Sequence, residues 1–276
     1  MQRSMRMTPG PAERPVAHRF RLLGKRSITS AIAALTAAVV VTANPMPAQA
    51  VDPATIVGAA MKAYDVYQKL AGGGLTLEDA TTRIIDAVNT AKTDIMRHTD
   101  RLATAEVRAC TTSAVINVAD IGALSPDSRQ LFALNATDCV TLAQSLLSTV
   151  GTAAAVDELG FAVNVVGPIA LLARTSAGLM TGGLRSSLIA ADNTVLTRLK
   201  PSCVDIPLWG DAGPGQPVEV EIICTAYNGA RGYDAVVLRI RRGQPLPPID
   251  HTSAINDAVA ATSHPVAVAA LPVLTA

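Results

Sequence analysis

The residues best suited to acid–base chemistry are few in this chain. After residue 50 the sequence has three histidines, His98, His251 and His264. His98 follows Asp94 by four residues, a helical spacing at which a carboxylate could orient a catalytic base. No nucleophile signature accompanies His98, so we interpret it as a polar residue that interrupts an apolar helix stripe. The other two histidines lie in a proline-interrupted segment, where a rigid catalytic geometry is not expected.

Compact catalytic and cofactor-binding signatures are absent from the sequence. It contains no H-E-x-x-H, no G-x-S-x-G, no phosphate-binding G-x-x-x-x-G-K and no dinucleotide fingerprint. Asp157 and Glu158 are adjacent, so on a helix they point about 100° apart and would not face one substrate as glycosidase carboxylates do. We therefore predict no catalytic residue, no metal site and no cofactor. A secreted hydrolase with a dispersed site is kept as the second alternative.

The cysteines point to disulfide chemistry. An even number of cysteines in a chain with an export signal predicts disulfide bonds. No C-x-x-C occurs and no histidine lies close to a cysteine, which disfavours zinc. Among three possible connectivities we favour pairing of neighbours in sequence, because each such pair falls within one structural region. The predicted bonds are Cys110 to Cys139 and Cys203 to Cys224.

Three aromatic residues near the C-terminal sheet form a candidate ligand platform. Trp209, Tyr227 and Tyr233 lie within 25 residues of one another and could present their rings to a small ligand. The alternative is that these rings fill the interface between the sheet and the helices, which is the commoner use of aromatic side chains.

The first 50 residues have the parts of a secretory signal peptide. The basic stretch RFRLLGKRS precedes an apolar run and an A-x-A exit at Ala48 to Ala50. We predict cleavage after Ala50 and a secreted, extracellular product, as for a bacterial exported protein; an uncleaved membrane anchor is the alternative. Without the leader, 16 basic and 21 acidic residues remain, a formal net charge of −5. This chain lacks the basic surface that nucleic-acid binding requires.

Residues 51–200 predict an antiparallel helical bundle. Apolar residues recur every three or four positions from Leu77 to Ala109, which predicts one helix longer than four heptads. Thr76 and Ser125 are placed to cap helices, and Pro168 to start one. Further along, a second apolar stripe is predicted to be buried: Leu131, Leu134, Leu142, Leu146 and Val150.

Residues 201–242 predict a disulfide-linked β-sheet packed on the bundle. Apolar and polar residues alternate in this region, and Pro207 indicates an edge strand. In the hairpin from Val218 to Arg241, a turn centred near Ala230 would make one face ionic and the other apolar. The ionic pairs would be Glu219 with Arg241 and Glu221 with Arg239.

The last segment, residues 243–276, is predicted to be a flexible tail rich in proline and alanine. A short helix near residues 253–261 fits its pattern, and packing of the segment on the bundle is the alternative. The fold class is therefore mainly α, with an antiparallel bundle and a C-terminal β-hairpin or three-stranded sheet.

These features favour a non-catalytic extracellular binding or interaction protein. Its partner would be an extracellular protein or an envelope component whose identity the sequence does not give. The alternative is a membrane-active, pore-forming-like protein, because residues 159–173 are the most apolar part of the mature chain. That segment has 15 residues and contains Asn164 and Pro168, so it is shorter than the roughly 20 residues of a membrane span. Membrane contact is not favoured.

Overall fold

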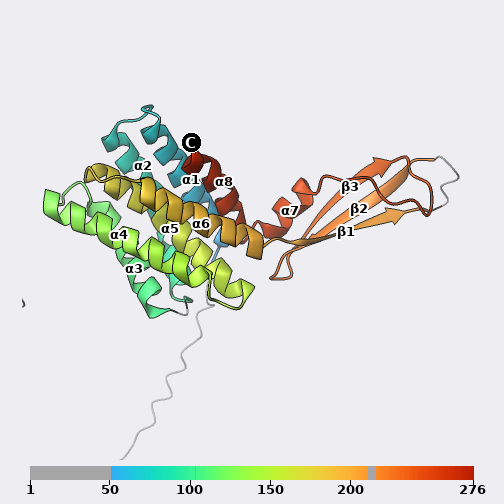
Figure 1. The fold of residues 1–276 in the computed structure, drawn as a ribbon, viewed down its shortest axis with the longest axis horizontal. Coiled ribbons are helices and arrows are strands. Elements are labelled where there is room, and N and C mark those ends of the chain that lie inside the picture. The colour runs from blue at the N-terminus through green and yellow to red at the C-terminus, as the bar shows by residue number, and fades with distance from the viewer. Residues whose placement is uncertain (1–50, 103, 211–215) are drawn as a thin grey trace, which may run out of the picture. The chain divides into compact units, whose positions relative to one another are not determined.

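The computed structural model describes residues 51–102, 104–210 and 216–276. The predicted leader lies outside the described residues. Those residues form eight α-helices, a 3-10 helix and a three-stranded antiparallel sheet (Figure 1), which confirms the predicted mainly α class. The elements are α1 (Pro53–Ala71), α2 (Leu77–Thr99), α3 (Ala105–Asn117), η1 (Val118–Asp120), α4 (Pro126–Leu147), α5 (Ala153–Ser176), α6 (Gly182–Arg198), β1 (Ser202–Leu208), β2 (Val218–Thr225), β3 (Arg231–Leu238), α7 (Thr252–Val259) and α8 (His264–Thr275).

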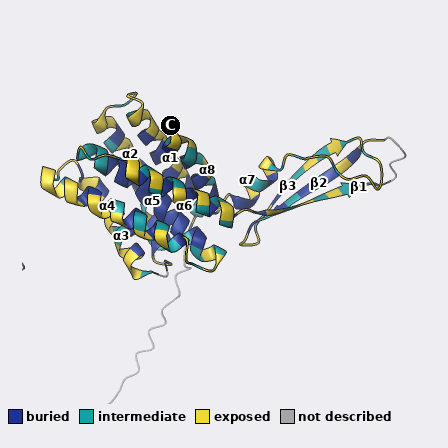
Figure 2. Ribbon diagram, in the orientation of Figure 1, coloured by how far each residue is buried: buried dark blue, intermediate teal, exposed yellow. Residues whose placement is uncertain are grey.

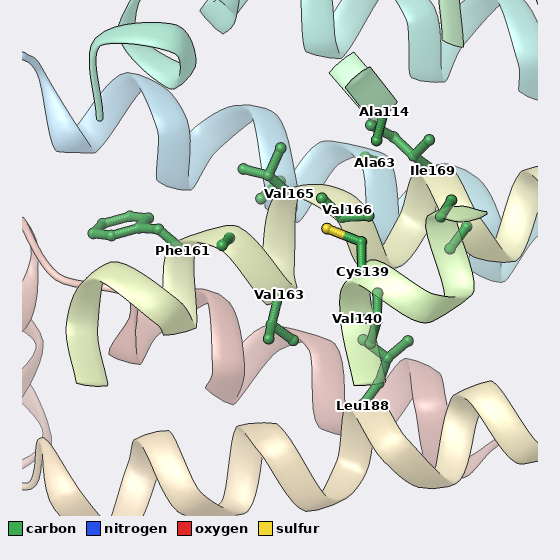
Figure 3. Packing of buried hydrophobic residues seen from close by; sticks show 14 of the residues in the cluster. Ala63, Ala114, Cys139, Val140, Phe161, Val163, Val165, Val166, Ile169 and Leu188 are labelled. Carbon is green, nitrogen blue, oxygen red and sulfur yellow. The ribbon is translucent and has the colours of Figure 1, made fainter. Parts of the chain in front are cut away.

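Helix α5 is the central helix of the bundle. Of its 24 residues, 17 are buried (Figure 2), and Figure 3 shows Val163 and Val165 pointing to opposite sides of it. The helix continues through Pro168, so the predicted helix start at that residue is wrong. Proline removes one helical hydrogen bond, and burial of the apolar residues around it on all sides offsets that loss.

The predicted long helix is divided in two. Thr76 and Ser125 cap α2 and α4 as expected, because their hydroxyls accept from the amides of Asp79 and Ser128. However, α2 ends at Thr99 and α3 begins at Ala105. The apolar spacing continues across the break, because Leu102 is buried in the bundle core although it lies outside both helices.

The buried face of α4 differs from the predicted one. Leu131, Leu134 and Leu142 are exposed, and Leu146 and Val150 are only half-buried. The face one position further along the helix packs inward instead, with Phe132, Ala136, Cys139, Ala143 and Leu147 buried. The disulfide from Cys139 to Cys110 joins this face to α3.

Both predicted disulfides are present. Cys110 and Cys139 connect α3 with α4, and Cys203 and Cys224 connect the neighbouring strands β1 and β2. The second bond closes a loop of 21 residues, which the chain-entropy account values at about 3 kcal/mol. Disulfides are consistent with an oxidising extracellular compartment.

The sheet has the strand order β1–β2–β3, so β1 is an edge strand as Pro207 indicated. The hairpin turn forms earlier than predicted, because Gly229 adopts φ +83° and the Asn228 side chain accepts from the amide of Ala230. The predicted ion pairs are therefore wrong. Glu219 lies opposite Val237, and Glu221 lies opposite Ala235.

The C-terminal segment is folded, so the predicted flexible tail is wrong. Helix α8 contributes Val266, Ala267, Ala270 and Leu274 to the core of the bundle. Helix α7 packs on one face of the sheet at the end near the bundle, where Ala254 and Ala258 pack with Ile222 and Cys224 (Figure 1). The sheet thus packs on α7, whereas we expected it to pack on the bundle.

Candidate functional site

His98 lies at the end of α2 among apolar neighbours. Its ring meets the Phe161 ring edge-on at 4.6 Å between centroids, and Ile95 and Leu102 line the same small space. Burial, followed by the nearby Arg101 charge, lowers the pKa of His98 to about 4. The imidazole is therefore neutral at pH 7 and is packed as a core side chain. Two hydroxyls line the same space, and they hydrogen-bond elsewhere: Thr99 donates to the carbonyl oxygen of Ile95, and Thr111 pairs with Cys139 Sγ.

A polar cluster inside the bundle joins α1, α5 and α6. The Asn164 amide donates to the Asp192 carboxylate at 3.0 Å and to the carbonyl oxygen of Gly160 at 3.0 Å. Burial raises the pKa of Asp192 to about 7, and this effect outweighs the hydrogen bond from Asn164, which lowers the pKa. Within the described residues, the Tyr64 hydroxyl and the second Asp192 oxygen make no hydrogen bond. The three side chains, Tyr64, Asn164 and Asp192, are all buried.

This polar cluster depends on glycine at position 167. A Cβ atom there would lie 2.5 Å from the Tyr64 hydroxyl oxygen and 2.8 Å from a Leu188 methyl group. Buried polar groups that contact one another restrict how helices can pack. We therefore interpret the cluster as setting the register of α1 and α6 on α5. The available signal was Asn164, a single polar residue inside an apolar run, whereas Asp192 stands beside the polar Asn193 and Thr194, and the pattern did not pair the two.

Asp157 links the hairpin and α8 to α5. Its carboxylate accepts from the Tyr227 hydroxyl at 2.7 Å and from the Ser263 amide at 2.6 Å. Burial raises the pKa of Asp157 in spite of these two hydrogen bonds. Asp157 is buried and ties together three elements that are distant along the chain.

The three aromatic residues of the predicted ligand platform lie apart. Trp209 follows the end of β1 and stacks with the Arg242 guanidinium, 5.6 Å from the ring centroid. Tyr227 lies in the hairpin turn and binds Asp157. Tyr233 lies in β3 opposite Ile223, with 53% of its surface exposed. The rings are therefore used for three separate contacts.

The sheet face opposite α7 is open and apolar. The strand register places four rows on this open face. Three of them are largely apolar: Val204, Ile223 and Tyr233; Ile206, Glu221 and Ala235; and Leu208, Glu219 and Val237. The fourth, at the end of the strands next to the hairpin turn, is polar and consists of Ser202, Thr225 and Arg231. The outer strands β1 and β3 supply exposed apolar side chains, among them Val237 at 67%. The central strand supplies two glutamates, which in the described part of the chain have no ion-pair partner.

The open face is the most distinctive surface of the sheet. Part of it is hollowed, with a volume of 400 Å³ between Leu208, Glu219 and Tyr233. Sequence reasoning found the alternation of the strands but assigned arginine partners to both glutamates. The two-residue spacing of Val204, Ile206 and Leu208 was the available signal for an apolar face.

Helix α5 has the length and composition to cross a membrane, and 89% of an apolar stretch of 18 residues within it is buried in the bundle. Among the described residues it is the one single helix that meets these criteria; α7 and α8 meet them only together, as a pair bent by 114°. The continuous helix is longer than the 15-residue segment expected from the sequence.

The residues that the structure describes contain no group of three or more histidine, cysteine or acidic side chains placed to hold a metal ion. Comparison with known proteins gives no match, because no family model fits the chain and neither a curated protein nor a solved structure is detectably similar.

Proposed function

We propose that the mature chain is an exported, non-catalytic binding protein that uses the open face of its sheet to bind a protein partner. The observation that carries the proposal is the row of exposed apolar side chains on β1 and β3 beside two unpaired glutamates on β2. Contiguous exposed apolar surface is uncommon on soluble proteins and marks interaction sites.

The charge of the open face defines the chemistry of the partner. Glu219 and Glu221 lie at the centre of the face, so a bound surface must supply cationic groups to them or leave two carboxylates without water. A segment in which valine or leucine alternates with lysine or arginine meets both requirements. A second copy of the same face would bring four carboxylates together, and an anionic lipid surface would repel them.

The test is binding of a designed peptide to the full mature chain. The probe is a synthetic peptide of alternating valine and lysine, followed by the fluorescence of Trp209, the sole tryptophan in the sequence. We expect saturable binding, and binding weakened by about tenfold in Val237→Ser. The matched control is Val268→Ser on α8, because Val268 is half-exposed and lies away from the sheet.

Charge is tested separately. The double variant Glu219→Gln, Glu221→Gln should lose the preference for the valine–lysine peptide over a valine–glutamate peptide of equal length. Equal binding of both peptides by the unaltered protein, or equal effects of Val237→Ser and Val268→Ser, would contradict the proposal.

Membrane activity is a second candidate, and the length of α5 is the observation that favours it. It requires α5 to leave the bundle and give up its contacts with Tyr64, Asp192 and Leu188. Leakage of dye-loaded anionic liposomes between pH 5 and pH 7.5 would support this candidate, and intact liposomes over that range would exclude it.

A further inference from the structure

A second concave surface lies on the bundle, between α3 and α4. This α3–α4 groove has a volume of 630 Å³, within the range of about 300–1,000 Å³ that small-molecule sites occupy. Its floor is formed by the Cys110–Cys139 disulfide with Ala114 and Ala136, and Leu131 and Leu142 form part of its walls.

The groove exists because the side chains between the two helices are small. Ala109 and Ser113 of α3 face Ala136 of α4, which leaves space that larger residues would fill. The disulfide holds the Cα atoms of Cys110 and Cys139 at 5.6 Å. A covalent tie at this position fixes the spacing of the helices, so the groove is a permanent feature of the bundle.

The lining of the groove is apolar where it is most exposed. Leu131 has 59% of its surface exposed, at a position of α4 where a polar side chain would also fit. Phe132 lies beside it and is nearly buried. An exposed leucine next to a nearly buried phenylalanine and an apolar floor suits an aliphatic chain more than a polar ligand.

The charged groups of the groove are all acidic. The ionisable side chains that line it are Glu106 and Asp138, both exposed, and within the described residues neither forms an ion pair. Glu106 lies one helical turn before Cys110, and Asp138 is adjacent to Cys139. At the other end of the groove the polar residues are the neutral Asn117 and Ser128. The groove therefore has an acidic end and a neutral end.

We propose that the α3–α4 groove binds a single-chain amphiphile with a cationic headgroup. The aliphatic chain lies along Leu131, Phe132 and Leu142, and the headgroup is placed near Glu106 and Asp138. An anionic amphiphile of the same length meets two carboxylates and binds more weakly. This site is separate from the open face of the sheet and does not depend on it.

The test is isothermal titration of the full mature chain, with both disulfides intact, below the critical micelle concentration. The probes are decyltrimethylammonium, the uncharged decyl glucoside and decanoate. We expect the cationic probe to bind with one site per chain and at least about tenfold more tightly than decanoate.

Two sets of variants locate the site. Leu131→Ser should weaken binding of decyltrimethylammonium by about tenfold, whereas Leu134→Ser should leave it unchanged, because Leu134 is exposed on the same helix outside the groove. The double variant Glu106→Gln, Asp138→Asn should bind the cationic and uncharged probes equally while keeping the affinity for decyl glucoside.

Three results would overturn the proposal. One is equal affinity for the three probes, and another is equal loss of binding in Leu131→Ser and Leu134→Ser. The third is a Leu131-dependent dimer of the free protein in sedimentation, which would assign the groove to a second copy of the chain. Each variant should still bind the valine–lysine peptide, so failure here is distinguishable from failure of the proposed function.

Discussion

The bundle and the sheet distribute polar and apolar groups in opposite ways. The bundle buries Asp192 and Asn164 in its interior, where charge is costly. The sheet leaves Val204 and Val237 exposed on its open face, where apolar surface contributes nothing to folding. Each region contains one disulfide, so covalent linkage does not explain the difference between them.

The buried polar groups of the bundle and the open face of the sheet have different roles. The buried polar groups are satisfied in part by one another and by the backbone, which is how a core uses polarity to fix the packing of helices. The open face has no such partner within the described chain. Contiguous exposed apolar surface of this kind is typical of interaction sites, which is the basis of the binding role proposed for the open face. The comparison therefore predicts that mutations in the two regions have different consequences.

The largest loss of stability is expected where the sheet meets α7. In Gly232→Val a side chain would collide with the carbonyl oxygen of Ala254, and its Cβ would lie 2.7 Å from the amide nitrogen of Ala258. Both atoms belong to the backbone of α7 and cannot rotate away, so we expect a loss of about 3 kcal/mol in the free energy of unfolding. Urea denaturation measures this loss. Gly183→Ala is the control, because a Cβ there meets no atom within 4 Å.

Asp192→Asn should stabilise the protein at high pH. Burial raises the folded-state pKa of Asp192 to about 7, above its unfolded value of 3.8, so its contribution is most favourable below pH 3.8 and is lost as the pH rises to 7. The variant should gain up to about 4 kcal/mol at pH 8 and little at pH 4. Thermal unfolding across this range gives the measurement. A gain that does not change with pH would show that Asp192 is not held in its neutral form.

His98→Gln should have the opposite pH dependence. The folded-state pKa of His98 is lowered to about 4 from 6.5, so protonation favours the unfolded chain as the pH falls from 6.5 to 4. At pH 4.5 the variant should be more stable than the unaltered protein by about 2 kcal/mol, with little difference at pH 7.5. Titration of the His98 ring by NMR provides an independent check, and an ordinary pKa near 6.5 would contradict the burial argument.

The smallest effect on stability is expected on the open face. Val237→Ser should change the free energy of unfolding by less than about 0.5 kcal/mol, because Val237 is mostly exposed. The matched change Val220→Ser, in the neighbouring strand but on the covered face, should cost about 2 kcal/mol or more, because Val220 is fully buried. Similar costs for the two valines would remove the distinction between the faces.

Local patterns were sufficient for much of the fold. Helix caps at Thr76 and Ser125, the edge position of β1 and both disulfides follow from short-range chemistry, and the structure contains them. The errors fall where a distant contact decides between local options. The proline-rich C-terminal segment is folded because α7 packs on the sheet and α8 packs in the core of the bundle.

The candidate sites show the same division. Strand alternation specified which residues share a face of the sheet, since side chains alternate with a period of two regardless of the turn. The turn at Asn228 and Gly229 decided which residues lie opposite the glutamates, and that shift removed their arginine partners. The three aromatic residues predicted to form one platform lie instead in three separate places, with Trp209 beside Arg242, Tyr227 bound to Asp157 and Tyr233 on β3.

The sequence by itself determined the mainly helical character of residues 51–200, the strands that follow, the disulfide pairs and the expectation of export, because these depend mainly on residues near one another along the chain. The tertiary structure alone decided which face of α4 is buried, that Asp192 meets Asn164, and which face of the sheet packs on α7 while the other stays open. These outcomes depend on which apolar surfaces pack together although they are far apart along the chain. The periodicity of one segment does not show which other segment it packs against.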